Sequence, residues 1–470
     1  MSAPHGCSLM FVLPGILILI ALVYVRPQEF VGLLEGTPIL YLAFALAVFG
    51  LALDFRLGNS RLRAVPLFAW AIAFGLWAMF TLLLHAPGEL VGSLRTVLVP
   101  LALFALIAHG IQTFRGLHWI AALLVLLVVY LGLVGLHLSQ QELQCVVWDE
   151  ASGGDLLGTP DGRSCEMPLD CREGGEPGAA YLCERAGLFE TMTVGERIRY
   201  RGTLGDPNEL SLVMSIGMVL MFGFVALARR PSPGRWLFAA GLIALVLTCV
   251  ILAQSRSGQL VFMTVLGAYL IKRLGWGGLV LGLLITVPLL LLGGLVGSDR
   301  DDAQASTDER LATLYEGIDM FTTSPFFGVG FGQFTEHHYL TAHNSAVLVA
   351  AETGIVGLVL WGTMIYLAFK IPVAVLRRYA HRPEARVART WAMAILAAQA
   401  GIATGSIFLS FAYQHVAWIY LGLAGALYSA VKTHDPDFEV RAGPFDVAAV
   451  AAGGVAYLAG LFVYLRLIGA

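Results

Sequence analysis

Apolar stretches of about 20 residues recur along almost the whole chain, and they limit its fold more than any other feature. An α-helix of that length rises about 30 Å, which is the thickness of the hydrocarbon core of a bilayer. Of the 470 residues, 58% are hydrophobic and only 13% are charged, which leaves too little polar surface for a soluble protein of this size. The sequence therefore predicts an all-α polytopic membrane protein. Its formal net charge of −3 gives no reason to expect nucleic acid as a partner.

The apolar windows predict about 12–13 transmembrane helices. They lie near residues 9–25, 38–53, 64–84, 94–112, 117–138, 209–228, 235–254, 258–272, 276–297, 345–369, 390–410, 414–431 and 445–466. The window at 258–272 is short and fits a tilted or half helix. No Lys or Arg precedes the first window, so we expect a retained helix there rather than a signal peptide.

Basic residues predict which ends of these helices face the cytoplasm. One alternate set of connections holds most of the Lys and Arg residues, including the three lysines Lys272, Lys370 and Lys432. We expect this set and the N-terminus in the cytoplasm, and the C-terminus outside. This topology gives three membrane bundles, at residues 1–138, 209–297 and 343–470. Two long outer loops, at residues 139–208 and 298–342, separate them.

Four of the six cysteines fall in the first outer loop: Cys145, Cys165, Cys171 and Cys183. An even number of cysteines in one Gly- and Asp-rich loop predicts two disulfides, with three connectivities open. Disulfides persist in oxidising compartments, so this loop is expected outside, in agreement with the basic residues. A zinc site is the alternative, but no two of these cysteines have the close spacing that zinc sites use. The sequence therefore predicts no metal.

Uncommon polar segments gather on the outer side of the predicted topology. They are RYRGTLGDPNEL, AQSRSGQL, DERLATLYEGIDMFTTSPFFGVGFGQF, HNSAVLVAAETGIVG and LSFAYQH, at residues 199–210, 253–260, 308–334, 343–357 and 409–415. Secondary transporters instead place polar groups near the bilayer midplane on broken helices. The predicted spans are nearly free of charge, and Glu352 is the clear exception. An outer functional face is therefore expected, with Glu352 as a buried partner of an arginine or a hydroxyl.

His343 is expected in the first turn of a helix, at the positive end of the helix dipole. That position disfavours imidazolium and leaves a neutral base. Arg201 and Arg256 would offer planar guanidinium groups to a phosphate-rich anion. Arg201 could also be a solvated loop charge, Arg256 a snorkelling anchor and His343 an interfacial residue. A base with an anion seat at an outer membrane face indicates group transfer from a lipid pyrophosphate, by a single inverting displacement.

Four segments carry a resemblance to the O-antigen ligase and O-antigen polymerase superfamily of bacterial membrane glycosyltransferases. Residues 343–357 fit a pattern of His, then Asn, Ser or Gln, nine residues, Gly, two residues, and Gly, Thr or Tyr. Residues 201–208 resemble the first arginine motif of the family and residues 255–258 the second. Residues 325–330 resemble the segment that precedes the histidine.

The resemblance implies a GT-C-like enzyme that needs no metal, cofactor or nucleotide sugar. It implies an undecaprenyl-pyrophosphate-linked glycan donor and a periplasmic active site in the bacterial inner membrane. His343 would be the catalytic base, and the pyrophosphate would bind Arg201, Arg256 and, on position alone, Arg310. Supporting roles are expected for Asn208, Asn344, Glu352, Tyr413 and Gln414.

The acceptor separates the functions that the family offers. A polymerase of O-antigen or exopolysaccharide repeat units is favoured, with a chain-length regulator as a candidate partner. A ligase that transfers the glycan to lipid A-core is second, and a protein O-oligosaccharyltransferase is third. Outside this family, a flippase or small-solute transporter and a non-catalytic envelope scaffold are the alternatives.

Overall fold

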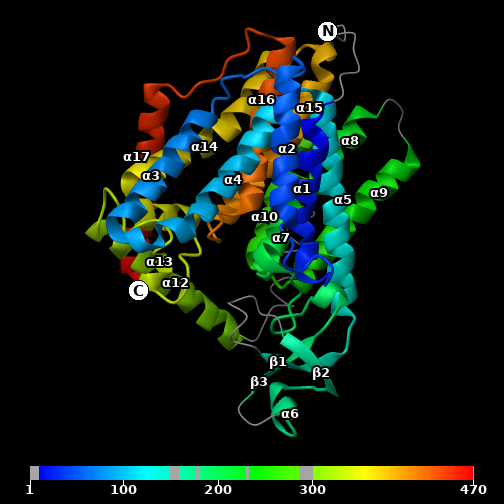
Figure 1. Cartoon of the computed structure of the whole chain (residues 1–470), viewed down its shortest axis with the longest axis vertical. Coiled ribbons are helices and arrows are strands. Elements are labelled where there is room, and N and C mark those ends of the chain that lie inside the picture. Colours follow the sequence, from blue (N-terminus) through cyan, green and yellow to red (C-terminus); the bar gives the residue numbers. More distant parts are fainter. Residues whose placement is uncertain are drawn as a thin grey trace. The chain divides into compact units, whose positions relative to one another are not determined.

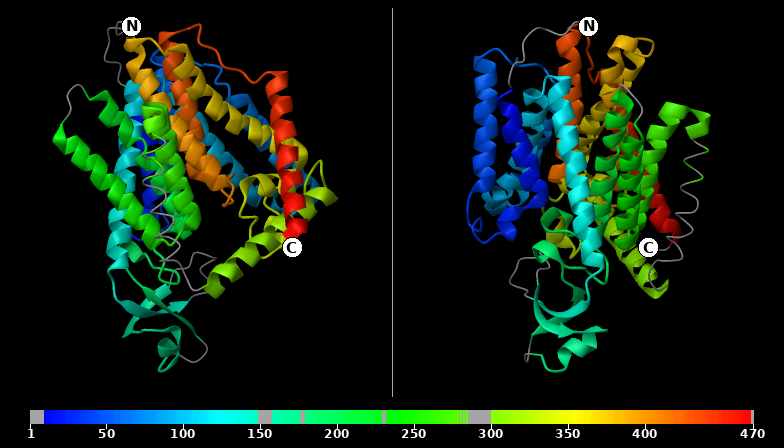
Figure 2. Two further views of the ribbon diagram at one scale, coloured as in Figure 1. Left: turned by 180° about the vertical axis from the view of Figure 1, so that it is seen from behind. Right: turned by 90° about the vertical axis from the view of Figure 1, so that its right-hand side faces the viewer.

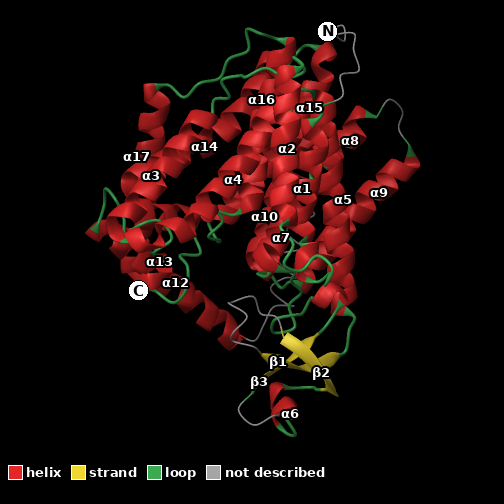
Figure 3. Cartoon of the chain, in the orientation of Figure 1, coloured by secondary structure: helices red, strands yellow, loops and turns green. Residues whose placement is uncertain are grey.

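A computed structural model describes residues 10–148, 158–175, 179–228, 232–278, 280, 282, 284 and 300–468. Figure 3 shows that these residues are mostly helical and that the strands form a single small sheet. Nine helices within the described residues are long and apolar enough to cross a membrane. The predicted all-α polytopic membrane fold is therefore confirmed.

The nine candidate spans follow the apolar windows closely (Figure 1). They are α2 (Ile39–Arg56), α3 (Phe68–His85), α4 (Leu90–Gly110), α5 (Phe114–Ser139), α7 (Pro207–Met218) with α8 (Met221–Leu227), α9 (Pro233–Leu252), α14 (Ser345–Arg378), α16 (His415–His434) and α17 (Pro444–Ile468).

Three further windows form helices that are shorter or less apolar than these spans. They are α1 (Val12–Val25), α10 (Arg256–Leu274) and α15 (Arg386–Ser406). The window predicted at 276–297 lies almost wholly outside the described residues. About 12–13 spans were predicted. Within the described part of the chain, nine helices meet the length and composition that a span requires.

The chain divides into two compact units. The first unit comprises Met1–Ile18, Ala43–Ile120 and Ser298–Ala470, and α14 is its central helix. This helix packs against α3, α15, α16, α17 and α12 (Arg300–Thr323). Helix α16 packs along α4, where a Cβ at Gly425 would lie 2.6 Å from the Cβ of Ala108. Small residues thus bring these two helices into backbone-close contact, as is usual between membrane helices.

The second unit comprises Leu19–Leu42 and Ala121–Gly297. Helices α7 and α10 pack together in it, and a Cβ at Gly258 would lie 2.3 Å from the Cβ of Ser211. The segment between α5 and α7 contains a three-stranded antiparallel sheet in the order β2-β1-β3, seen from two further sides in Figure 2. The strands are β1 (Leu143–Trp148), β2 (Gly158–Ser164) and β3 (Ala180–Arg185), with the short helix α6 (Pro168–Arg172) between β2 and β3.

Two disulfides hold this sheet. Cys145 is bonded to Cys171, and Cys165 is bonded to Cys183. Cys145 lies opposite Cys183 in the register of β1 and β3, yet each bonds to a cysteine outside that pair. The structure thus selects one of the three connectivities that the sequence leaves open.

Peptide mapping of the non-reduced protein is expected to yield the Cys145–Cys171 and Cys165–Cys183 linkages. Removing either bridge should destabilise the sheet by roughly 2–5 kcal/mol, because the unfolded loop gains freedom. Cys249 is buried and should be alkylated only after unfolding. A linked Cys145–Cys183 peptide would contradict this pairing.

Candidate functional site

The N-terminus of α14 is capped by Asn344. Its side-chain Oδ1 accepts hydrogen bonds from the backbone N–H groups of Ala346 and Val347, each at 3.1 Å. This is the usual way in which an Asn satisfies the free N–H groups of a first helical turn. The position next to the histidine in the sequence motif is therefore the N-cap, and Asn344 is 2% exposed.

His343 precedes this cap. It is partly exposed, and its φ of 47° lies in the left-handed region that few residues other than glycine adopt. The expectation that His343 sits in the first helical turn is therefore wrong, because Ser345 is the first helical residue. A capped helix start and an unusual backbone conformation together fix where the imidazole leaves the chain.

The α15–α16 connection is bound to the same helix start. The side-chain amide of Asn344 donates to the carbonyl oxygen of Ile407 at 3.0 Å. The Ser345 hydroxyl donates to the carbonyl oxygen of Leu409 at 2.7 Å and accepts from the N–H of Phe411 at 2.9 Å. The segment 407–414, which holds Tyr413 and Gln414, thus lies beside the residues that carry His343.

Helix α14 is interrupted at Gly354, where φ is 67° and ψ is −169°. A break of this kind removes the partners of nearby backbone groups, which must be satisfied by other protein groups inside a membrane. The groups affected are the carbonyls of Ala351 and Glu352 and the N–H of Ile355. The apolar pattern continues through the break, so periodicity alone does not reveal it.

A docked segment, residues 325–334, supplies the missing partners. The N–H of Val329 donates to the carbonyl of Ala351 at 2.8 Å, and the N–H of Gly330 donates to that of Glu352 at 3.0 Å. In return, Ile355 N–H donates to the carbonyl of residue 325 at 2.8 Å. Two segments of the sequence motif are therefore joined by three backbone hydrogen bonds.

Two glycines make this docking sterically allowed. A Cβ at Gly328 would lie 2.3 Å from the carbonyl carbon of Glu352, and one at Gly354 would lie 2.2 Å from the carbonyl oxygen of Phe326. Both glycines also have a φ of 67°. The backbone of the docked segment, rather than a neighbouring membrane helix, lies against Gly354. A Cβ at Gly357 would lie 3.4 Å from Cδ1 of Trp77 on α3, so this glycine faces a neighbouring helix.

Glu352 is 3% exposed and lies under the docked segment. Its Oε1 accepts a hydrogen bond from the N–H of Phe334 at 3.2 Å. Its Oε2 and the hydroxyl of Tyr413 are both buried without a hydrogen-bond partner among the residues that the structure describes. Burial, and then the nearby Glu352 carboxylate, raise the pKa of the Tyr413 phenol well above its usual range. Within the described chain Glu352 forms no ion pair with an arginine, and the group beside its carboxylate is the Tyr413 hydroxyl, which is the other kind of partner expected.

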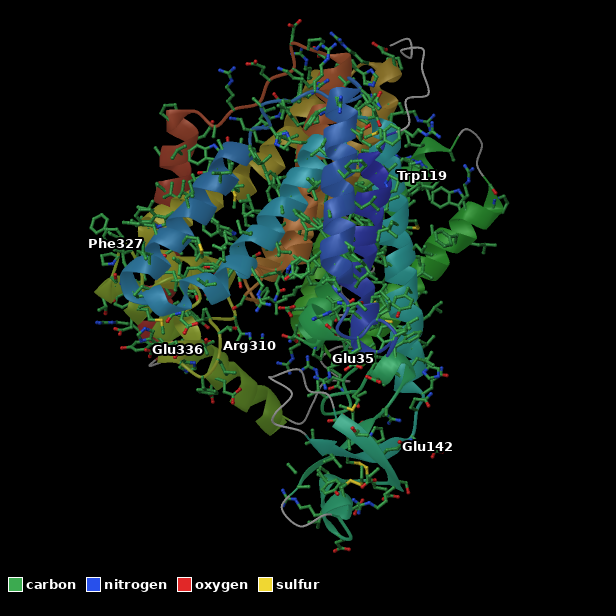
Figure 4. All side chains as sticks on the ribbon, viewed as in Figure 1. Glu35, Trp119, Glu142, Arg310, Phe327 and Glu336 are labelled. Atoms are coloured by element: carbon green, nitrogen blue, oxygen red, sulfur yellow. A yellow bond between two sulfur atoms is a disulfide. The ribbon has the colours of Figure 1, made fainter. Side chains whose placement is uncertain are left out.

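Arg310 and Gln414 are the remaining candidates in the first unit. Arg310 lies on α12, is partly buried, and is labelled in Figure 4. Gln414 is the residue before α16 and is also partly exposed.

The second arginine motif lies at a junction of two helix starts in the second unit. The Ser255 hydroxyl caps α10 by accepting from the N–H of Gly258 at 2.9 Å, and it donates to Oδ1 of Asn208 at 2.7 Å. Asp206 caps α7 by accepting from the N–H of Asn208 at 2.8 Å. Arg256 is the first residue of α10 and is exposed. The N-termini of two helices and an exposed guanidinium favour an anion here.

Arg197 lies at this junction, and the sequence motifs did not point to it. Its Nε donates to the carbonyl of Ala253 at 3.0 Å, and its Nη2 lies 3.4 Å from Oδ1 of Asn208. The available signal was the alternation in RIRYR, since residues two apart in extended chain share a face.

Arg201 is enclosed by protein rather than open to an anion, and is 3% exposed. Its Nη1 donates to the carbonyl of Phe189 at 2.8 Å and to Oε2 of Glu190 at 3.0 Å. Its Nη2 donates to the carbonyl of Glu29 at 3.0 Å. Phe189 and Glu190 have φ values of 59° and 55°, so the cover over Arg201 has a strained backbone.

The structure therefore gathers the candidates into two groups, one in each unit. Asn344, Glu352 and Tyr413 surround the helix start that carries His343, while Asn208 joins the turn that carries Arg256.

Residues 241–362 match a family model described as O-antigen ligase. The matched region includes the Arg256 turn, the docked segment and the interrupted start of α14. The match supports the O-antigen ligase and polymerase superfamily, as the sequence motifs predicted. No curated protein matches the chain.

Gly354→Ala and Gly328→Ala are each expected to lower the free energy of unfolding by about 2 kcal/mol or more, because a side chain there clashes and φ is left-handed. Thermal unfolding in detergent measures this. Gly453→Ala is the matched control on α17, where an added Cβ meets nothing within 4 Å. Equal midpoints for Gly354→Ala and the control would contradict the docking.

Proposed function

We propose that this chain, as a member of the O-antigen ligase and polymerase superfamily, is a metal-independent inverting glycosyltransferase of the bacterial inner membrane. Its donor is a glycan on undecaprenyl pyrophosphate at the periplasmic face, and its product is polymerised O-antigen or exopolysaccharide. The family match supports a glycosyltransferase-type enzyme, and the apolar helices a multi-pass membrane protein. The observation that carries the proposal is the position of His343, which directly precedes the Asn344 cap of the interrupted helix α14.

The proposed reaction is a single displacement. An acceptor hydroxyl oxygen attacks the anomeric carbon of the donor sugar and forms the new glycosidic bond. The bond between that carbon and the pyrophosphate oxygen breaks, and the electron pair leaves with lipid pyrophosphate. An imidazole nitrogen of His343 takes the hydroxyl proton. Guanidinium groups stabilise the charge that develops on the leaving group.

Arg256 is the best-supported anion ligand of the second unit because it is exposed at a helix start. Arg197 lies at the same junction and is included in the proposed site. Arg201 is included in the proposed site because of the family resemblance. In the structure, however, the Glu190 carboxylate forms an ion pair with its guanidinium, where a phosphate would bind. Phosphate binding to Arg201 therefore requires that Glu190 leave. Arg310 stays a weaker candidate ligand on α12.

The interrupted α14 bears on the transporter alternative, since broken helices line ion and substrate paths in transporters. Here the carbonyls of Ala351 and Glu352 and the N–H of Ile355 all bind the backbone of the docked segment. Each of these groups therefore already has a hydrogen-bond partner within the protein. This satisfied break favours an immobile scaffold for chemistry over a gate.

O-antigen ligase is the second candidate, favoured by the description of the matching family. The two reactions differ in acceptor, so an assay that contains only the purified protein and lipid-linked repeat units distinguishes them. A polymerase lengthens the glycan without another acceptor. A ligase forms no product until lipid A-core is added, and a protein O-oligosaccharyltransferase requires a protein hydroxyl.

His343→Ala should lower kcat by about 100-fold or more, because it removes the base. Arg256→Ala should lower kcat/KM by about 10- to 100-fold, because it removes one charge-assisted contact to pyrophosphate. Arg441→Ala is the control, since that arginine is exposed and pairs with Glu439. Activity is measured in vesicles with lipid-linked glycan, with and without EDTA.

Normal glycan transfer by both His343→Ala and Arg256→Ala would contradict the proposal. Flux of the lipid-linked glycan across the bilayer without a new glycosidic bond, seen by mass spectrometry, would favour a flippase. Activity that disappears in EDTA and returns with Mg²⁺ would overturn metal independence.

Glu190→Gln should lower KM for the lipid-linked donor by about two- to fivefold. The Glu190 side chain is exposed, so its ion pair with the buried Arg201 is worth at most about 1 kcal/mol, and the substitution removes the negative charge that competes with phosphate for Arg201. Glu439→Gln is the matched control, an exposed carboxylate paired with Arg441. An unchanged or higher KM for Glu190→Gln would indicate that Arg201 is purely structural.

A further inference from the structure

We infer that Glu352 is a positioning residue, which fixes the two segments beside His343 in place without touching the reacting atoms. The effect on catalysis rests on the proposed function, whereas the effect on the segments does not. The proposal starts from an uncommon fact. A carboxyl group that is 3% exposed has one oxygen bound to a backbone N–H and one oxygen with no hydrogen-bond partner in the described part of the chain.

Glu352 holds the docked segment at two points. Its carbonyl oxygen accepts from the N–H of Gly330 at 3.0 Å, and its side-chain Oε1 accepts from the N–H of Phe334 at 3.2 Å. The first contact uses the backbone and is available to any residue at 352. The second requires a side-chain acceptor of this length, and it lies on the part of the chain that leads directly to His343.

Glu352 also reaches the α15–α16 connection through Tyr413. The phenol hydroxyl is buried beside the carboxylate, and the aromatic ring packs against Phe331 of the docked segment, with ring centroids 4.7 Å apart. The same connection is bound to the start of α14 through Ser345. Glu352 and Tyr413 therefore lie where both segments that flank His343 meet.

Distance argues against Glu352 as a direct acid or base. It lies seven residues beyond Ser345, the first residue of α14, which places it about 10 Å along the axis from the helix start that His343 precedes. A carboxyl group buried among helices costs several kcal/mol unless hydrogen bonds compensate it. The compensation visible here comes from the docked segment, which indicates that holding this segment is the function of the residue.

Glutamine provides the decisive comparison. Glu352→Gln keeps an oxygen that can accept from Phe334 N–H and adds an amide that can donate to the Tyr413 hydroxyl. Glu352→Ala removes both. Gln399→Ala is the matched control, because Gln399 is also buried and donates to the carbonyl of Tyr420 on α16, away from the docked segment.

The experiment combines amide hydrogen exchange of peptides covering 328–334 with steady-state transfer kinetics of the full-length protein in vesicles. Glu352→Ala should raise exchange about tenfold or more and lower kcat about tenfold or more, with KM for the lipid-linked donor within about twofold. Glu352→Gln should restore exchange and kcat to within about threefold of the starting protein. Gln399→Ala should change neither, even if its melting temperature falls.

Unchanged exchange in Glu352→Ala overturns the inference. So does a Glu352→Gln variant with normal exchange and the low kcat of Glu352→Ala, because the carboxylate would then act directly. If Glu352→Ala does not fold, Tyr413→Phe takes its place. This variant is expected to lose about threefold or more in kcat at an unchanged melting temperature. A Tyr413→Phe variant with an unchanged kcat overturns the inference. If the starting protein transfers no glycan, the proposed function fails, while the exchange comparison still decides the role of Glu352.

Discussion

Three backbone hydrogen bonds between the break in α14 and the docked segment are the interaction on which the candidate site depends. A span interrupted in its N-terminal third leaves polar backbone groups that lipid cannot satisfy. The docked segment satisfies them, and in doing so it is fixed against the helix that begins beside His343. The stability of the membrane-embedded fold and the geometry of the site therefore have the same source.

The residues at the start of α14 connect this helix to a further segment of the chain. Asn344 uses its oxygen for the first turn of α14 and its amide for the α15–α16 connection, so one side chain serves two segments. Ser345 does the same with a donated and an accepted bond. A short polar cluster thus orders the connections around the histidine, in a region where loops would otherwise be mobile.

Sequence reasoning recovered the features that local patterns determine. Apolar windows predicted the helices, and the spacing from His343 to Gly357 identified the motif. It could not recover features that depend on partners distant in the chain. The break at Gly354 is invisible because apolar residues continue through it. The enclosure of Arg201 depends on Glu29, 172 residues away in sequence. The small sheet was missed because its strands are short and β2 contains two Gly, a Pro and an Asp, residues that are depleted in strands.

Docking through the main chain also has a consequence for which side chains of the docked segment can change. The bonds at the break involve N–H and C=O groups only, so most side chains of the docked segment are not needed to keep it in place. Phe326 is 66% exposed and Phe327 is 40% exposed, although both flank the break. Side chains at these two positions can therefore change without loss of the backbone bonds, whereas a side chain at Gly328 or Gly354 would clash with the facing backbone. One backbone arrangement can thus present different side-chain surfaces beside the break.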